Sequence, residues 1–293
     1  MHNAIANSTL VLAASGSATL EVILLKKPLI VFAALPKITY FFAKFILKIN
    51  LPYISLPNFL VNKPIIPEFV QSNIIVENIF IIAPTSERSG VAHCVSYNEP
   101  MRLDKISKNR YSVSGYPADC VIAGIHHVMK KDPPSLVLSG VNRGNNSAEN
   151  VLYSGTIGAA LEGALQGVTS IALSQYLGPE SEKMSNPFNP AIHNGLSVIH
   201  KILNKDEHTE GGYKVFYNVN FPPTEIIKGV AVVPQGLRPN TTFGVSPFKT
   251  YSGKEFLFIK GGNQHIKVSQ NSDVAANLSG YISLTPMRAD LTA

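Results

Sequence analysis

The chain has 293 residues, of which 45% are hydrophobic and 15% are charged, so it can form one large or two ordinary globular domains with a sizeable core. Its two cysteines, Cys94 and Cys120, cannot build a disulfide framework, and its first residues lack the basic segment of a secretory signal, so we expect a cytoplasmic protein. The net charge of +6 comes mainly from residues 1–71, which contain no arginine, and this pattern speaks against a nucleic-acid polymer as partner.

Residues 1–71 are apolar and nearly free of acidic side chains. Their most apolar stretch is interrupted by Pro36 and by lysines, so no run reaches the about 20 uncharged residues that a membrane span needs. Residues 37–49 instead predict a basic amphipathic helix, which suits a peripheral contact with an anionic membrane surface. An ordinary surface helix packed on a core has the same pattern, and both interpretations stay open.

The composition changes between residues 71 and 74, and short apolar strands then alternate with helices. Buried strands are predicted in "NIFIIAP" (78–84), "PSLVLSG" (134–140) and "VTSIALSQ" (168–175). A strand, a turn and a helix are predicted in residues 111–129, and a helix in residues 156–167. This alternation predicts an α/β fold with a largely parallel sheet, whose ligands bind at the carboxyl ends of the strands.

After residue 211 the pattern changes to strands with few helices. Strands are predicted in "YKVFYNVNFP", "KGVAVVPQG" and "GYISLTP". The segment "SPFKTYSGKEFLFIKG" predicts an extended hairpin arm that turns at Ser252 and Gly253. The carboxyl-terminal part is therefore expected to be β-rich.

Three segments that follow apolar strands are expected to meet at one edge of the sheet: residues 83–90, 114–120 and 139–164. Ser89, Asn142 and Asn146 offer hydroxyl and amide groups there, although asparagines also serve turn geometry.

The segment Ser154-Gly155-Thr156 stands where the next helix begins, and the free N–H groups at such a position favour a phosphate. Ser154 or Thr156 acting only as a helix cap is the alternative. Asp119 is expected to cap a helix, and the histidines are not spaced as zinc ligands.

The order of "APTSERSG", "GYPADCV", "LVLSGVNRGNNSAENVLYSGTIGAALEGALQGVTSIALS", "YNVNFP" and "SDVAANLSGYISLTP" resembles the SurE (survival protein) family of 5′-nucleotidases over residues 74–293. The resemblance implies a Rossmann-like core, a swapped carboxyl-terminal arm, and a homodimer or homotetramer. It also implies divalent-metal-dependent hydrolysis of nucleoside 5′-monophosphates.

Matched to the family's motifs, Ser89 and Asn142 are metal ligands, and Asn146, Ser154, Gly155 and Thr156 bind the phosphate. Asn146, Ser154 and Thr156 are thereby the expected catalytic residues. The family begins with a strand that ends in an Asp-Asp pair, whereas this chain has no aspartate before Asp104. Mg²⁺ and Mn²⁺ are held mainly by carboxylate oxygens, so the metal is expected to be weakly held and the activity impaired.

Residues 1–71 resemble the carboxyl-terminal part of lipid-A-disaccharide synthase, a glycosyltransferase that uses a UDP-sugar. The residues that match its donor-side motif are Ser15, Gly16, Ser17, Thr19 and Glu21. The expected organisation is therefore a foreign α/β fragment (1–71) joined to a SurE-like phosphatase domain (74–293) that lacks its first strand and helix.

Two alternatives to a nucleotidase stay open: a non-catalytic oligomer that binds phosphate, and a remnant of a lipid A glycosyltransferase. A further hypothesis concerns the fold, because a parallel sheet that lacks a strand leaves unpaired backbone groups. Residues 8–14 form a strand-like segment before a Gly-Ser loop, and we hypothesise that they fill the missing position beside residues 78–84.

Overall fold

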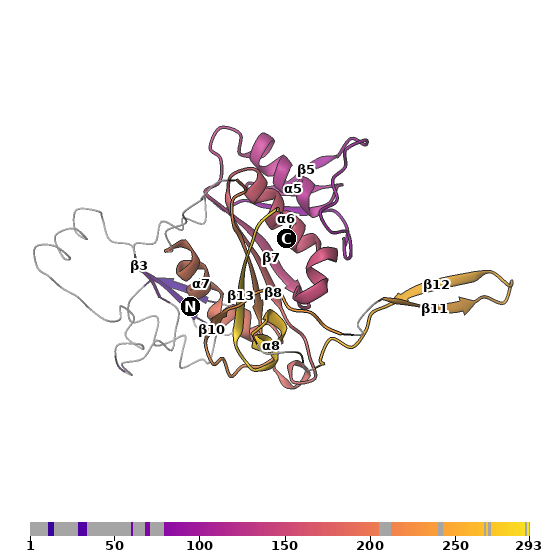
Figure 1. Cartoon of the computed structure of the whole chain (residues 1–293). Coiled ribbons are helices and arrows are strands. Elements are labelled where there is room, and N and C mark those ends of the chain that lie inside the picture. Colours follow the sequence, from indigo (N-terminus) through magenta and orange to yellow (C-terminus); the bar gives the residue numbers. More distant parts are fainter. Residues whose placement is uncertain are drawn as a thin grey trace, which may run out of the picture. The chain divides into compact units, whose positions relative to one another are not determined.

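The computed structural model describes residues 11–14, 29–33, 60, 68–70, 79–204, 212–239, 243–266, 268, 271–290 and 292. The chain divides into two compact units, Met1–Ile79 and Phe80–Ala293, which are taken separately below (Figure 1). The boundary predicted between residues 71 and 74 lies outside the described residues.

The described part of the first unit is a parallel sheet of three short strands. Its order is β1 (Val11–Ala14), β2 (Leu29–Ala33) and β3 (Glu68–Val70), with Val11 opposite Leu29 and Val31 opposite Glu68. The hypothesis that residues 8–14 lie beside residues 78–84 is therefore wrong for the described residues of that segment, because β1 pairs with β2 in a sheet that does not contain β4. The predicted helix 37–49 and the donor-side motif 15–21 lie outside the described residues.

The main sheet of the second unit has five strands in the order β10-β13-β9-β8-β7. Parallel pairs join β7 to β8, β8 to β9 and β10 to β13, whereas β13 runs antiparallel to β9. The bounds are β7 Leu136–Arg143, β8 Thr169–Gln175, β9 Phe216–Phe221, β10 Val230–Val232 and β13 Ile282–Met287. The prediction of a largely parallel α/β sheet followed by a β-rich end is confirmed.

A second, smaller sheet precedes the main one in the chain. Strand β4 (Ile81–Pro84) pairs in parallel with β6 (Arg110–Val113), and β6 pairs antiparallel with β5 (Leu103–Ser107). Strand β6 leads into α5 (Pro117–Ala123), which continues as the wider helical turn η3 (Gly124–Val128). The predicted strand, turn and helix of residues 111–129 are thereby confirmed.

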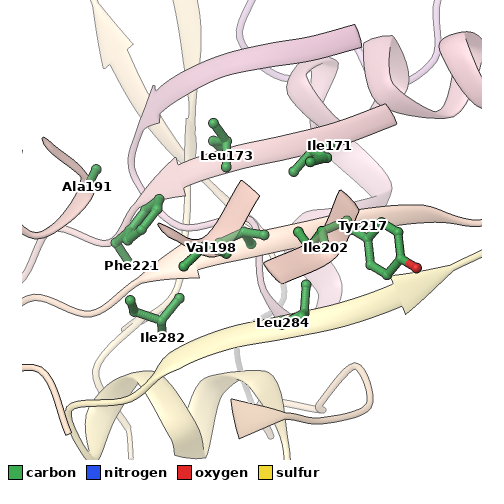
Figure 2. Packing of buried hydrophobic residues seen from close by; sticks show 10 residues of the cluster. Ile171, Leu173, Ala191, Val198, Ile202, Tyr217, Phe221, Ile282 and Leu284 are labelled. Carbon is green, nitrogen blue, oxygen red and sulfur yellow. The ribbon is translucent and has the colours of Figure 1, made fainter. Parts of the chain in front are cut away.

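The remaining helices connect or cover the strands of the main sheet. They are η4 (Ala148–Tyr153), α6 (Gly155–Leu165), η5 (Ser181–Lys183), α7 (Asn189–Leu203) and α8 (Asp273–Leu278). Successive side chains of a strand point to opposite faces of a sheet, and β8 uses both of its faces for packing. Ile171 and Leu173 pack with Val198 and Ile202 of α7, and Ala172 packs with residues of α6 on the other face (Figure 2 shows the α7 side).

Strands β4 and β7 differ from the prediction that both are buried. Ile81 is 48% exposed and Leu138 is also 48% exposed, whereas β9 is buried along its whole length. The physical reason is their place in the sheets. Among the described residues, β4 pairs only with β6 and β7 pairs only with β8, so each lies at the edge of its described sheet. Strands β4 and β7 therefore have the apolar sequence of a central strand, but about half of their apolar side-chain surface at Ile81 and Leu138 is exposed.

The predicted hairpin arm is confirmed. Strands β11 (Gly244–Lys249) and β12 (Glu255–Lys260) pair antiparallel and project from the second unit, with every residue of both strands exposed (Figure 1). Gly253 has a φ of 79°, a left-handed conformation that glycine adopts without steric cost, and this closes the turn at the predicted place.

Candidate functional site

The loops that follow β4 and β6 meet the start of α6, as the sequence predicts. A Cβ atom placed on Gly155 would lie 3.0 Å from Cγ of Pro117 and 3.3 Å from the carbonyl oxygen of Arg88. Arg88 also donates from Nη2 to the carbonyl oxygen of Ser114 at 3.2 Å. Glycine at position 155 therefore permits a close approach of three backbone segments at one point.

The first turn of α6 is capped by Ser154, which is one of the two roles that the sequence leaves open for this residue. Its hydroxyl accepts the N–H of Ile157 at 3.1 Å, and its carbonyl accepts the N–H of Gly158. Among the described residues, the N–H groups of Gly155 and Thr156 donate to no protein acceptor. Two backbone donors and the positive end of the helix dipole thus remain for an anion.

Asn146 is buried and is held by the sheet rather than by its own loop. Its Nδ2 donates to the hydroxyl of Ser174 at 2.7 Å, and its backbone N–H donates to Oδ1 of Asn220 at 2.7 Å. Its carbonyl accepts from Nδ2 of Asn218 at 2.7 Å. The motif "YNVNFP" therefore places two fully buried amides under this loop, and they fix its backbone. The predicted phosphate contact of Asn146 stays a prediction.

The two expected metal ligands form short-range contacts with their own loops. The hydroxyl of Ser89 donates to Oε1 of Glu87 at 3.0 Å, and Nδ2 of Asn142 donates to the carbonyl oxygen of Gly144 at 3.1 Å. Both side chains offer neutral oxygens, and the described residues contain no group of three histidine, cysteine or acidic side chains placed to hold a metal ion. This donor set does not fit a tightly held divalent cation, which needs carboxylate oxygens.

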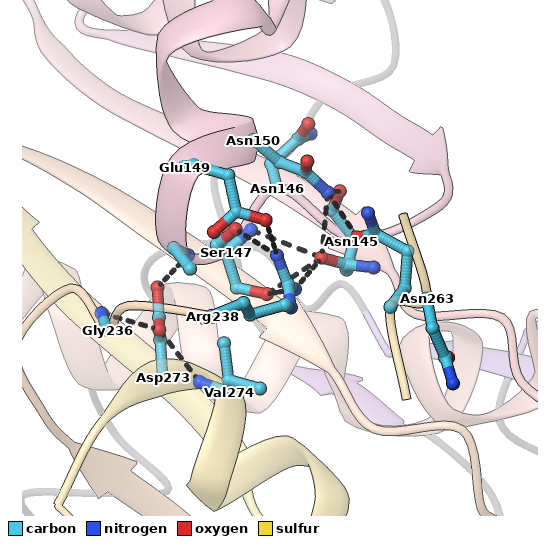
Figure 3. A network of polar contacts seen from close by, with 12 residues as sticks. Asn145, Asn146, Ser147, Glu149, Asn150, Gly236, Arg238, Asn263, Asp273 and Val274 are labelled. Carbon is cyan, nitrogen blue, oxygen red and sulfur yellow. Dashed lines mark hydrogen bonds and ion pairs between the residues drawn. The ribbon is translucent and has the colours of Figure 1, made fainter. Parts of the chain in front are cut away.

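The acids of the segment 139–164 are engaged elsewhere. Glu149 accepts from Nη1 of Arg238 at 2.9 Å, and Arg238 is 3% exposed (Figure 3). Glu162 accepts from Nε2 of Gln166 and lies 2.7 Å from Nε2 of His93, with which it forms an ion pair when the histidine is protonated. Both carboxylates therefore already have protein partners.

Arg238 and Asp273 brace the loop between β7 and α6, and sequence reasoning missed both. Nη1 of Arg238 donates to the carbonyl oxygen of Ser147 at 3.0 Å. Asp273 accepts the N–H groups of Ala148, Gly236 and Val274 at 2.7 to 3.0 Å (Figure 3). Burial raises the pKa of Asp273, and these backbone donors act in the opposite direction. The signal in the sequence is the acid that follows Ser272, the N-cap of α8.

Two further polar groups near the loops have structural roles. Asp119 accepts the N–H of Tyr116 at 2.7 Å and both the N–H and the hydroxyl of Ser96, which confirms its expected role as a cap of α5. The guanidinium carbon of Arg88 lies 4.9 Å from the ring centroid of Tyr116, a cation–π distance. Arg88 was not singled out in the sequence, and it brings a positive charge to the place where the loops meet.

Comparison with known proteins gives two matching families on different parts of the chain. The model described as "Survival protein SurE" matches residues 61–242, and the model described as "Lipid-A-disaccharide synthetase" matches residues 1–87. The second match covers the segment in which the sequence resembles a glycosyltransferase.

Individual relatives agree with the first family. The 5′-nucleotidase SurE of Roseobacter denitrificans is 52% identical over 217 residues, which are 73% of this chain and 83% of that protein. The 5′-nucleotidase SurE of Ruegeria pomeroyi is also 52% identical over 217 residues, with 84% of its length covered. Among solved structures, the SurE protein from Aquifex aeolicus matches 78% of this chain and 85% of its own, with a TM-score of 0.60 and 32% identity.

Proposed function

Because this chain belongs to the survival protein SurE family, we propose that its second unit binds nucleoside 5′-monophosphates and hydrolyses them as a phosphomonoesterase. The observation that carries the proposal is the start of α6, where the N–H groups of Gly155 and Thr156 have no acceptor among the residues that the structure describes. A phosphate there would also accept from the hydroxyl of Thr156. Arg88 adds positive charge beside it.

The neutral side chains of Ser89 and Asn142 limit the expected metal affinity and the expected rate of hydrolysis. In the proposal, Ser89 and Asn142 contribute a hydroxyl and an amide oxygen to Mg²⁺ or Mn²⁺. Glu87 accepts from the Ser89 hydroxyl, but the described residues contain no group of three histidine, cysteine or acidic side chains placed to hold a metal ion. Such a site would hold a divalent cation weakly, and the hydrolytic rate would be correspondingly low. Since phosphate binding in this proposal depends on α6 and not on the metal, we expect nucleotide binding to be kept where hydrolysis is lost.

The same observation favours one second candidate, a phosphate-binding oligomer without catalysis. It differs from the first in a measurable way, because its nucleotide binding does not change when divalent cations are removed. The glycosyltransferase alternative rests on residues 1–87, and formation of a lipid disaccharide from a UDP-sugar is the assay that would support it.

The test uses the purified full chain and a panel of nucleoside 5′-monophosphates. Phosphate release is measured with Mn²⁺ and with EDTA, and nucleotide binding is measured by calorimetry under both conditions. Phosphate release that requires Mn²⁺ and is lost in Asn142→Ala supports the nucleotidase. Binding that persists in EDTA without phosphate release supports the second candidate, and no nucleotide binding in either condition contradicts both.

The assembly and location of the chain are part of the proposal. We propose a homodimer or homotetramer joined through β11 and β12, because a hairpin with large apolar side chains on both faces needs a partner surface. A cytoplasmic location is supported by two cysteines that form no disulfide. Among the described residues no helix is long and apolar enough to span a membrane, and a peripheral contact through residues 37–49 remains a proposal.

A further inference from the structure

Residues 88–94, which we call the clasp segment, lie against one face of α6. Near the start of the helix, a Cβ atom on Gly155 would lie 3.1 Å from Cγ2 of Val91. One turn later, a Cβ atom on Gly158 would lie 2.5 Å from the carbonyl oxygen of Ala92. Both glycines therefore permit a close approach of the clasp segment, and this approach follows the helix over its first turns.

The side chains of His93 and Glu162 continue this contact by one further turn of α6. Glu162 lies on the same helix face as Gly158, four residues later, and is 5% exposed. Its Oε2 is 2.7 Å from Nε2 of His93, and its Oε1 accepts from Nε2 of Gln166 at 2.6 Å. A buried carboxylate needs hydrogen-bond donors. Since His93 belongs to the clasp segment, this contact ties the segment to α6.

The backbone of the clasp segment has a shape that depends on such contacts. Gly90 has a φ of 75° and Ala92 has a φ of 52°, and the left-handed conformation is unfavourable for an alanine. A strained residue keeps its conformation where its surroundings hold it. The N–H of Ala92 donates to the carbonyl oxygen of Tyr153 at 3.0 Å, and the next residue is His93 with its contact to Glu162. The strained position thus lies between two attachments to the region of α6.

The clasp segment begins with two residues of the proposed phosphate and metal site. Its first residue, Arg88, brings a carbonyl oxygen within 3.3 Å of a Cβ atom placed on Gly155, and Ser89 follows. We propose that His93 and Glu162 are positioning residues for nucleotide binding, because they hold the clasp segment and thereby keep Arg88 and Ser89 beside the start of α6. Neither positioning residue contacts the nucleotide. This inference rests on the proposed function, since it concerns the same site.

The test uses the full chain and adenosine 5′-monophosphate, with EDTA present so that only binding is measured. Affinity is determined by calorimetry, at a temperature where circular dichroism shows each variant to be folded. His93→Ala should weaken binding by roughly fivefold, the order expected for the loss of one hydrogen-bonded contact. It should also speed hydrogen exchange of the Ala92 amide. His93→Gln keeps an N–H that can donate to Glu162, so it should restore both quantities.

A second histidine of the same polar network provides the matched control. Nε2 of His126 lies 2.7 Å from Oε1 of Gln166, which in turn donates to Glu162. His126 belongs to η3 and not to the clasp segment. His126→Ala should therefore leave nucleotide affinity and exchange of the Ala92 amide unchanged. Equal weakening by His93→Ala and His126→Ala would assign the effect to a general disturbance of α6 and would overturn the proposal.

A pair of glycine variants displaces the clasp segment without removing either positioning side chain. Gly158→Ala places a methyl group where the carbonyl oxygen of Ala92 lies, so the segment must move away from α6. Gly195→Ala adds the same group to α7, where its nearest neighbour is Cζ of Phe221 at 3.8 Å, an ordinary contact. Gly158→Ala should weaken binding by roughly fivefold, and Gly195→Ala should not change it. Unchanged binding in Gly158→Ala would contradict the proposal.

A double-mutant cycle shows whether His93 acts through the clasp segment. In the background of Arg88→Ala, the further change His93→Ala should weaken binding by no more than about twofold, because the segment then no longer carries the charge that it positions. Independent effects that multiply in full would show that His93 acts by another route and would overturn the proposal.

The experiment separates a failure of this inference from a failure of the proposed function. If the unmodified chain binds no adenosine 5′-monophosphate, the proposed function is contradicted, and the positioning role with it. If the unmodified chain binds the nucleotide and His93→Ala binds it equally well, the positioning role alone is wrong.

Discussion

Ser154 and Thr156 lie on either side of Gly155, and the structure separates a capping role from a binding role. The Ser154 hydroxyl accepts a hydrogen bond from the N–H of Ile157, whereas Thr156 is half-buried at the start of the helix. We expect Ser154→Ala to lower the free energy of unfolding by about 1 kcal/mol, measured by urea denaturation. Thr156→Ala should leave stability nearly unchanged and weaken nucleotide binding instead. Equal effects of both substitutions on stability would contradict this assignment.

The thiols of Cys94 and Cys120 differ in their expected reactivity. Burial, and in second place the neighbouring carboxylate of Asp119, raise the pKa of Cys120 to about 12, so this thiol stays protonated and unreactive near neutral pH. Cys94 is half-buried and accessible. A thiol reagent should therefore modify one cysteine in the folded chain and both in denaturant. Cys94→Ser should remove the native reaction, and Cys120→Ser should leave it; the reverse pattern would be incompatible with the burial.

Among the elements, the arm formed by β11 and β12 carries the prediction about assembly. Both strands are exposed along their whole length, with Phe248 and Ile259 among the apolar side chains. Replacing residues 246–258 by a short Gly-Ser linker should reduce the assembly to monomers, as measured by light scattering, while the circular dichroism of the core is kept. As a control, Phe188, which precedes α7, is changed to alanine and should leave the mass unchanged. An unaltered mass without the arm would exclude the arm as the interface.

The elements also show what the sequence can predict. Local patterns suffice for β8, α6 and the hairpin turn at Gly253, because apolar periodicity, a helix cap and a glycine in the left-handed region act within a few residues. They fail for β4 and β7, whose apolar sequence predicts burial, since burial depends on a neighbouring strand far away in the chain. Local patterns also fail at the site, because Arg238 and Asp273 hydrogen-bond to Ser147 and Ala148, which are far from them in the sequence.

At the scale of the whole molecule, the second unit has a hydrophobic core of its own. The buried hydrophobic clusters of the described residues lie between Val151 and Leu284, within the second unit. A compact unit with its own core can fold alone. We therefore expect the fragment 79–293 to unfold cooperatively, with a midpoint close to that of the same transition in the full chain, as followed by circular dichroism.

The matched control removes the other end of the chain. The fragment 1–270 lacks α8 and β13, and with them Ile282 and Leu284 of the core and the Asp273 carboxylate that holds the loop at Ala148. Since β13 pairs with both β9 and β10, its loss also opens the middle of the main sheet, so this fragment should not unfold cooperatively. If instead the fragment 79–293 lost its cooperative transition, the first unit would be needed for the fold of the second.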